Sequence, residues 1–230
     1  GGAFGHSNDE VRYSFKYNVA YEHAFFGDYK TRIDLFGETR IGSPYSYTMQ
    51  DAGTVNGRSQ TFGTSGNTSR FLFYVPTGVN DPKIFYGDVD PVTHVSPTAQ
   101  RIDQIINSTG LKNYRGKIAP RNAFNSKWFT KIDLHIEQQI PTFVGKSRLS
   151  VFADIENLPN LINHKWGEQL RNFFPYTDVV AKVQCKAVGT NACGQYQYSA
   201  PSADSFLADQ LITVNGSSLY SIRIGARLIF

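Results

Sequence analysis

The chain has 230 residues, of which 40% are hydrophobic, 14% aromatic and 18% charged, and its formal net charge is +4. Its mean hydropathy is −0.33, and no apolar run approaches the ~18 residues that a membrane-crossing helix needs, so a transmembrane helix is excluded. The basic residues are dispersed and form no concentrated patch, which argues against nucleic-acid binding. No signal peptide opens the chain, and we expect it to be the C-terminal part of a longer precursor.

The first two predicted elements alternate apolar and polar residues with a period of two, the pattern of β-strands. Residues 11–26 place valine, tyrosine and phenylalanine on one face and mostly charged or amide side chains on the other. Residues 29–41 repeat this pattern after a short turn with Gly27 and Asp28, residue types that tight turns favour. We expect the two segments to form an antiparallel hairpin.

A long connection, residues 42–126, follows the hairpin. Residues 51–70 are rich in glycine, serine, threonine and asparagine, which predicts a mobile stretch. Residues 71–76 predict a short strand, and residues 97–109 a helix that Ser96 caps and Pro97 opens. Asp88 and Asp90 resemble half of a calcium loop, but the glycine and the glutamate of such a loop are absent.

Two further strands are predicted at residues 128–140 and 147–157, joined by a short turn. A second long connection, 158–217, contains an expected hairpin of residues 179–185 and 194–200. Cys185 and Cys193 are separated by residues that can form a turn, so we expect a disulfide, with two free thiols as the alternative. Such a bond would contribute about 2–3 kcal/mol, and oxidised cysteines fit a periplasmic or cell-surface location.

The last predicted strand, residues 218–230, alternates up to an aromatic terminus. This pattern resembles the C-terminal assembly signal of bacterial outer-membrane β-barrels, which the barrel-assembly machinery recognises. The signal residues on its apolar face are Tyr220, Ile222, Ile224, Ala226, Leu228 and Phe230.

The expected fold is all-β. It is a transmembrane antiparallel β-barrel portion of about five final strands, with two long extracellular loops, 42–126 and 158–217, and one short loop helix. If Phe230 lies on the periplasmic side, both short turns are also periplasmic and both long loops are external, as in known barrels. The alternative is a soluble β-sandwich, in which the apolar faces would form the core.

Catalytic and metal-binding patterns are weak in this sequence. No serine has the surroundings of a hydrolase nucleophile, and no two histidines have ligand spacing on one element. His135 lies between Asp133 and Glu137 on a predicted strand, which we interpret as a hydrated polar row and not a metal site. We therefore expect no enzymatic activity, no metal and no cofactor.

Four segments resemble the TonB-dependent outer-membrane receptors, in particular the Oar-like subfamily, whose members carry a carboxypeptidase-regulatory-like domain. The segments are GSPYSYTM, FLFYVPTGVNDPKIFY, YRGKIAPRNAFNSKWFTKIDLHIEQQIP and FADIENLPNLINHKWG. The resemblance implies a 22-stranded barrel in the outer membrane, filled by a plug. It also implies energy supplied by TonB with ExbB–ExbD. The plug and the other barrel strands would lie in an N-terminal part that this sequence does not contain.

The expected function is therefore energised uptake, with the external loops capturing a ligand. The candidate ligand-contacting aromatic residues are Tyr45, Tyr47, Tyr74, Phe173, Phe174 and Tyr176. Loop aromatics can equally pack the loops together. The alternatives are a surface protein of the same fold that serves adhesion or protein–protein contacts, and a passive porin.

Overall fold

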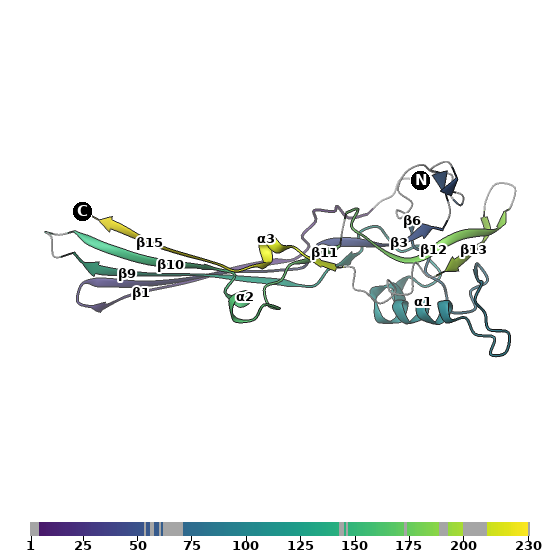
Figure 1. Ribbon diagram of the computed structural model, residues 1–230, viewed down its shortest axis with the longest axis horizontal. Helices are drawn as coiled ribbons and strands as arrows, with labels where there is room; N and C mark the ends of the chain where they lie inside the picture. The colour runs from purple at the N-terminus through teal and green to yellow at the C-terminus, as the bar shows by residue number, and fades with distance from the viewer. Residues whose placement is uncertain are drawn as a thin grey trace. The chain divides into compact units, whose positions relative to one another are not determined.

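The computed structural model describes residues 5–52, 54–55, 58–59, 61, 71–142, 145, 147–172, 174–188, 193–199 and 211–229. The chain divides into two compact units. We call residues 11–43, 126–171 and 212–230 the sheet unit, because one long sheet dominates them (Figure 1). We call residues 1–10, 44–125 and 172–211 the loop unit, because they come almost entirely from the two predicted loops.

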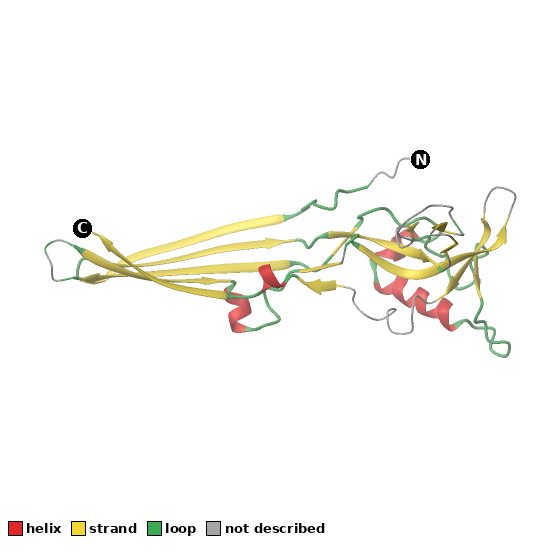
Figure 2. Cartoon of the chain, turned by 45° about the horizontal axis from the view of Figure 1, so that its top comes forward, coloured by secondary structure: helices red, strands yellow, loops and turns green. Residues whose placement is uncertain are grey.

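Five long strands form the sheet of the sheet unit, in the order β1-β2-β9-β10-β15 (Figure 2). Each neighbouring pair is antiparallel. The strands are β1 (Ser14–Phe26), β2 (Tyr29–Arg40), β9 (Phe129–Pro141), β10 (Arg148–Glu156) and β15 (Ser221–Ile229). All five predicted strands are therefore present, and the class is all-β.

The register brings the apolar residues of all five strands into common rows. One row runs through Val19, Leu35, Leu134, Ile155 and Ile222. The next row on the same face runs through Tyr21, Ile33, Ile136, Ala153 and Ile224. The predicted alternation therefore continues across the sheet as well as along each strand, because directly opposed residues share a face.

The apolar face of this sheet is uncovered by the described residues. Val19 is 61% exposed, Phe15 60% and Ile224 75%. The outer strands β1 and β15 each pair on one side only among the described residues. A soluble β-sandwich would bury this face as its core, whereas the described residues of the sheet unit leave it exposed.

Two short helices flank the last strands of the sheet unit. Helix α2 (Leu158–Ile162) follows β10, and α3 (Asn215–Ser218) precedes β15. A two-stranded sheet joins β11 (Leu170–Asn172) to β14 (Leu211–Thr213). The sequence predicted one loop helix, and α2 and α3 were missed because they are only five and four residues long.

Segments of both predicted loops pair with each other in the loop unit. The sheet order is β6-β3-β12-β13-β7, and β8 also pairs with β3. Its strands are β3 (Pro44–Asp51), β6 (Phe71–Leu72), β7 (Ile84–Tyr86), β8 (Phe124–Asn125), β12 (Thr177–Val188) and β13 (Cys193–Ser199). A short separate hairpin joins β4 (Thr54–Val55) to β5 (Arg58–Ser59).

The pairing in the loop unit includes parallel strands, for which the sequence analysis named no partners. Strand β12 runs parallel to β3, and β13 runs parallel to β7. The predicted hairpin of β12 and β13 is confirmed as antiparallel. Sequence patterns indicate strands but not their partners, so the parallel pairing of segments more than 100 residues apart could not be predicted.

Helix α1 (Pro97–Ser108) packs its apolar side into the core of the loop unit (Figure 1). The Oγ of Ser96 accepts a hydrogen bond from the backbone N–H of Ala99 at 3.0 Å, which confirms the predicted cap. Ile102 and Ile106 are each 1% exposed. Helix α1 ends at Ser108, within one residue of the predicted end at 109, and a separate 3₁₀ helix, η1 (Gly110–Tyr114), follows it. No helix of the described residues is long and apolar enough to cross a membrane.

Candidate functional site

The second face of the five-stranded sheet is polar, and its charges are interleaved. One row of directly opposed residues runs through Ala20, Asp34, His135, Asp154 and Arg223. Ion pairs link charges on this face, with N–O distances of 2.6 Å for Lys30–Glu22, 2.7 Å for Arg32–Asp34 and 3.4 Å for Lys131–Asp133. The face therefore suits contact with water or with a polar partner.

His135 lies at the centre of this polar face. Its Nδ1 is 2.6 Å from Oδ1 of Asp154, and its Nε2 is 3.4 Å from Oε2 of Glu137. Glu137 also accepts a hydrogen bond from the hydroxyl of Ser150. The nearest carboxylate comes from the neighbouring strand β10, which spacing along β9 alone could not reveal. No group of metal-binding side chains occurs among the described residues.

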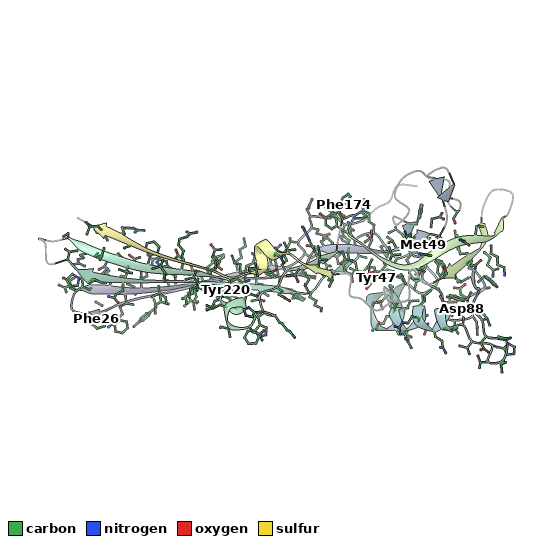
Figure 3. All side chains as sticks on the ribbon, viewed as in Figure 1. Phe26, Tyr47, Met49, Asp88, Phe174 and Tyr220 are labelled. Carbon is green, nitrogen blue, oxygen red and sulfur yellow. The ribbon has the colours of Figure 1, made fainter. Side chains whose placement is uncertain are left out.

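The predicted ligand-contacting aromatics separate into two groups. Tyr47 is 5% exposed and Tyr74 8%, and both belong to the core of the loop unit, against which Tyr45 packs. Tyr45, Tyr47 and Tyr74 therefore pack within the loop unit, which was the alternative expectation for them. Phe174, in contrast, is 81% exposed, and Figure 3 shows it at the surface (Figure 3). Phe173 lies outside the described residues.

Phe174 lines a surface hollow of about 360 Å³ that lies wholly within the loop unit. The other lining residues are Asn8, Ser46, Thr48, Leu72, Arg121, Asn122, Pro175 and Thr177. The lining combines hydroxyl and amide groups with the apolar side chains of Leu72, Phe174 and Pro175 and with a single charged residue, Arg121. Pockets that fix small molecules have this kind of apolar surface with a few placed polar groups.

Asn122 shapes the floor of this hollow. It is 2% exposed and has a φ of 51°, a left-handed conformation that asparagine tolerates better than most residues. Its Oδ1 accepts a hydrogen bond from Oγ of Ser46 at 3.0 Å, and its Nδ2 donates to the carbonyl oxygen of His6 at 2.7 Å. No local sequence pattern pointed to Asn122, because its partners Ser46 and His6 lie far away along the chain.

Asp81 organises the turn before β7. Its Oδ2 accepts hydrogen bonds from the hydroxyl of Tyr74 at 3.0 Å and from the backbone N–H of Thr77 at 2.8 Å. Its Oδ1 accepts one from the N–H of Lys83 at 2.9 Å. Burial raises the pKa of Asp81, but these hydrogen bonds together lower it below its ordinary value. Burial, with the hydrogen bond to Asp81, raises the pKa of Tyr74 to about 12.

The two aspartates of the half calcium loop have local structural partners. Asp88 accepts hydrogen bonds from the hydroxyl of Ser96 and, at 2.9 Å, from the N–H of Thr98. Asp90 accepts from the N–H groups of Val92 at 2.8 Å and Thr93 at 2.7 Å. Both carboxylates thus hold the start of α1 and the turn before it.

The cysteines lie on the paired strands β12 and β13. Cys185 is directly opposed to Tyr196, and Cys193 to Val188. No free cysteine occurs in the described part of the chain. The disulfide stays a prediction, because the side chain of Cys193 lies outside the described residues.

The expected assembly signal coincides with β15 and the residue before it. Ile222, Ile224, Ala226 and Leu228 lie on the apolar face, opposed to apolar residues of β10. Tyr220 is 39% exposed, and Phe230 lies outside the described residues. Recognition of this strand by an assembly machinery stays a prediction.

Comparisons with protein-family models, with curated proteins and with solved structures found no match to this chain.

Proposed function

We propose that the sheet unit forms part of the wall of an outer-membrane β-barrel, with the apolar face toward lipid and the polar face toward the lumen. The observation that carries the proposal is the register of the five strands. It gathers apolar side chains into continuous rows on one face and paired charges on the other. A transmembrane barrel wall needs this two-sided composition.

The edges of the sheet support the same proposal. Long, unpaired edge strands and large exposed apolar faces promote aggregation in water, and soluble proteins suppress both. In a membrane, further strands would pair with β1 and β15, and lipid would cover the apolar rows. Five strands are too few to close a barrel, for which about eight are needed, so the proposal requires other strands of the same protein.

Energised uptake in a TonB-dependent receptor is the function that we propose for the complete barrel. The support for this finer assignment is the resemblance of four sequence segments and the C-terminal strand pattern, since no comparison matched. In this proposal the hollow beside Phe174 and Arg121 captures the ligand. The polar face would contact a plug, and TonB with ExbB–ExbD would act on that plug. The barrel-assembly machinery would recognise β15.

An adhesive or protein-binding surface protein remains the second candidate, because the loop unit is a compact body with its own core. A hollow enclosed on several sides favours a small ligand, whereas flat loops would favour a protein partner. A passive porin is the third candidate, and it would need an open lumen.

Two measurements on the native polypeptide test this function. Peptide mapping of an outer-membrane fraction should find this chain there together with upstream plug peptides, and its recovery only from the soluble fraction would contradict the proposal.

In planar lipid bilayers, the purified protein should show no steady conductance, because a plug closes the lumen. A large, steady conductance would instead identify a porin.

A further inference from the structure

Hydrogen bonds inside the hollow of the loop unit engage the side-chain oxygens of both its asparagines. Oδ1 of Asn122 accepts from Oγ of Ser46 at 3.0 Å, and Oδ1 of Asn8 accepts from Nδ2 of Asn122 at 2.6 Å. Oγ of Ser46 in turn accepts from the backbone N–H of Asn122 at 2.8 Å. The buried pair of Ser46 and Asn122 is therefore satisfied within the protein, and a ligand must find its partners among the other groups of the lining.

Three side-chain donors in the described lining are left without a partner. Among the described residues, the guanidinium of Arg121, Nδ2 of Asn8 and the hydroxyl of Thr177 make no hydrogen bond or ion pair. Arg121 is exposed, and Asn8 and Thr177 are half-buried. Guanidinium and amide N–H groups donate hydrogen bonds and do not accept them. The free groups of the lining therefore favour a ligand that is rich in acceptors.

All three donors border the same buried pair. Thr177 is directly opposed to Ser46 in the parallel pairing of β12 with β3. Arg121 precedes Asn122 in the chain, and Asn8 is hydrogen-bonded to Asn122. Donors from three distant parts of the sequence thus line one hollow of about 360 Å³, and a single small group can meet them together.

An exposed aromatic ring supplies part of the apolar lining. Phe174 is 81% exposed, and Figure 3 shows it at the surface (Figure 3). Its ring centroid lies 5.9 Å from that of Tyr176, in an edge-to-face arrangement. Tyr176 has a φ of 63°, which is uncommon for a bulky side chain, and strained residues of this kind cluster at binding sites. Leu72 and Pro175 extend the apolar surface beside the donors.

The charge of the lining distinguishes between acceptor-rich ligands. Arg121 is its single charged residue, and no carboxylate occurs among the described lining residues. One guanidinium neutralises one negative charge, and its planar fork matches the two oxygens of a carboxylate. A phosphate monoester carries about −1.5 to −2 charges at pH 7 and would keep an unpaired charge here. A carboxylate with one negative charge therefore fits the lining better.

We propose that the hollow binds an organic acid that has one carboxylate and an adjacent apolar group. The guanidinium of Arg121 pairs with the carboxylate, to which Nδ2 of Asn8 and the hydroxyl of Thr177 also donate. The apolar group covers the ring of Phe174. The inference rests on the proposed role of this hollow in ligand capture, and it names the class of ligand that is captured. A free organic acid and the C-terminus of a peptide share this chemistry.

Isothermal titration calorimetry on the purified full polypeptide in lipid nanodiscs tests the site with matched probes. The probes are phenylpropionate, its uncharged amide phenylpropionamide, and phenyl phosphate. Wild type should bind phenylpropionate about tenfold more tightly than the amide, because the amide lacks the charge that pairs with Arg121. It should bind phenyl phosphate more weakly than phenylpropionate. Equal affinity for the acid and the amide, no binding of either, or tighter binding of phenyl phosphate would overturn the proposal.

Two variants separate the carboxylate contact from the apolar contact. Arg121→Gln should weaken the binding of phenylpropionate about tenfold and leave the binding of the amide unchanged. Phe174→Ala should weaken the binding of both probes about fivefold, because each loses the same ring contact. Unchanged binding of phenylpropionate by Arg121→Gln would contradict the assigned carboxylate contact.

The matched control is Arg101→Gln, the same change on α1 outside the hollow. It should bind all three probes as the wild type does. Circular dichroism should show native β-content in every variant compared.

A peptide probe identifies the source of the carboxylate. Alanyl-alanyl-phenylalanine with a free C-terminus is compared with its C-terminal amide and with phenylpropionate. Acid-selective binding that is tighter for the peptide would identify a peptide terminus as the ligand, and tighter binding of phenylpropionate would identify a free acid. Either result supports the carboxylate site.

Failure of the site and failure of the proposed uptake give different results. Loss of acid selectivity in a protein that is found in the outer membrane with its plug peptides would overturn the carboxylate site and leave uptake intact. An acid-selective hollow in a protein recovered only from the soluble fraction would keep the site and overturn uptake.

Discussion

The ring of Phe152 lies across Gly225 on the neighbouring strand. The two residues are directly opposed in the β10–β15 register. A β-carbon built on Gly225 would lie 2.4 Å from Cζ of that ring, too close for any real contact. Tyr17 covers Gly37 in the same way on the apolar face, where a β-carbon would lie 1.9 Å from the ring. Aromatic rings that cover strand glycines in this manner fix the register of a sheet.

Gly225→Ala should therefore destabilise the sheet. The added methyl group must push the Phe152 ring off its position, and overpacking of this kind costs about 1–3 kcal/mol. The thermal unfolding midpoint of the purified protein measures the effect. Gly216→Ala is the matched control, because nothing lies within 4 Å of its β-carbon position. Equal midpoints for the two variants would show that the packing of the Phe152 ring does not require a glycine at residue 225.

Asp81→Asn should destabilise the loop unit. The carboxylate accepts hydrogen bonds on both oxygens, and an amide would turn its N–H₂ group toward one of those donors. Leaving a buried donor without an acceptor costs about 1–3 kcal/mol. Asp9→Asn, a change at an exposed aspartate, is the control. Limited proteolysis should cut the loop unit faster in Asp81→Asn, and unchanged cleavage would contradict the role assigned to this carboxylate.

The stabilising effect of Asp81 should depend on pH. Its pKa in the folded chain is below the ordinary value of about 3.9. Its contribution is therefore fully present above that ordinary value and is lost as pH falls through the lower, folded pKa. The difference in unfolding midpoint between wild type and Asp81→Asn should be constant from neutral pH to about pH 5 and shrink below about pH 4. If the difference in unfolding midpoint instead grew on acidification, the lowered pKa assigned to Asp81 would be contradicted.

Cys185 and Cys193 should be linked in the mature protein. The denatured protein should react with a thiol reagent at these positions only after treatment with a reductant. Replacing both cysteines by serine should lower stability by about 2–3 kcal/mol, if the bond acts by constraining the unfolded chain. Labelling of both thiols without reductant would show that the cysteines are free.

The sequence predicted the parts of the fold that depend on local alternation. The five strands of the sheet unit and the capped helix at Ser96 were found because each has its own period or cap. It did not predict that β3 and β12 pair in parallel, because no local signal names a distant partner. For the same reason Asn122 and Asp154 were missed. For Tyr47 and Tyr74 the sequence left ligand contact and loop packing open, and both side chains lie in a core.

The most direct test of the barrel proposal is a comparison of the two faces of the sheet in a membrane. Spin labels at Val19 and Ile224 occupy the apolar face, and labels at Ala20 and Arg223 occupy the polar face. In the reconstituted full polypeptide, the first pair should be accessible to oxygen dissolved in lipid, and the second pair to a water-soluble nickel reagent. Water access to both faces, or protection of Val19 and Ile224 from both reagents, would contradict a lipid-facing barrel wall.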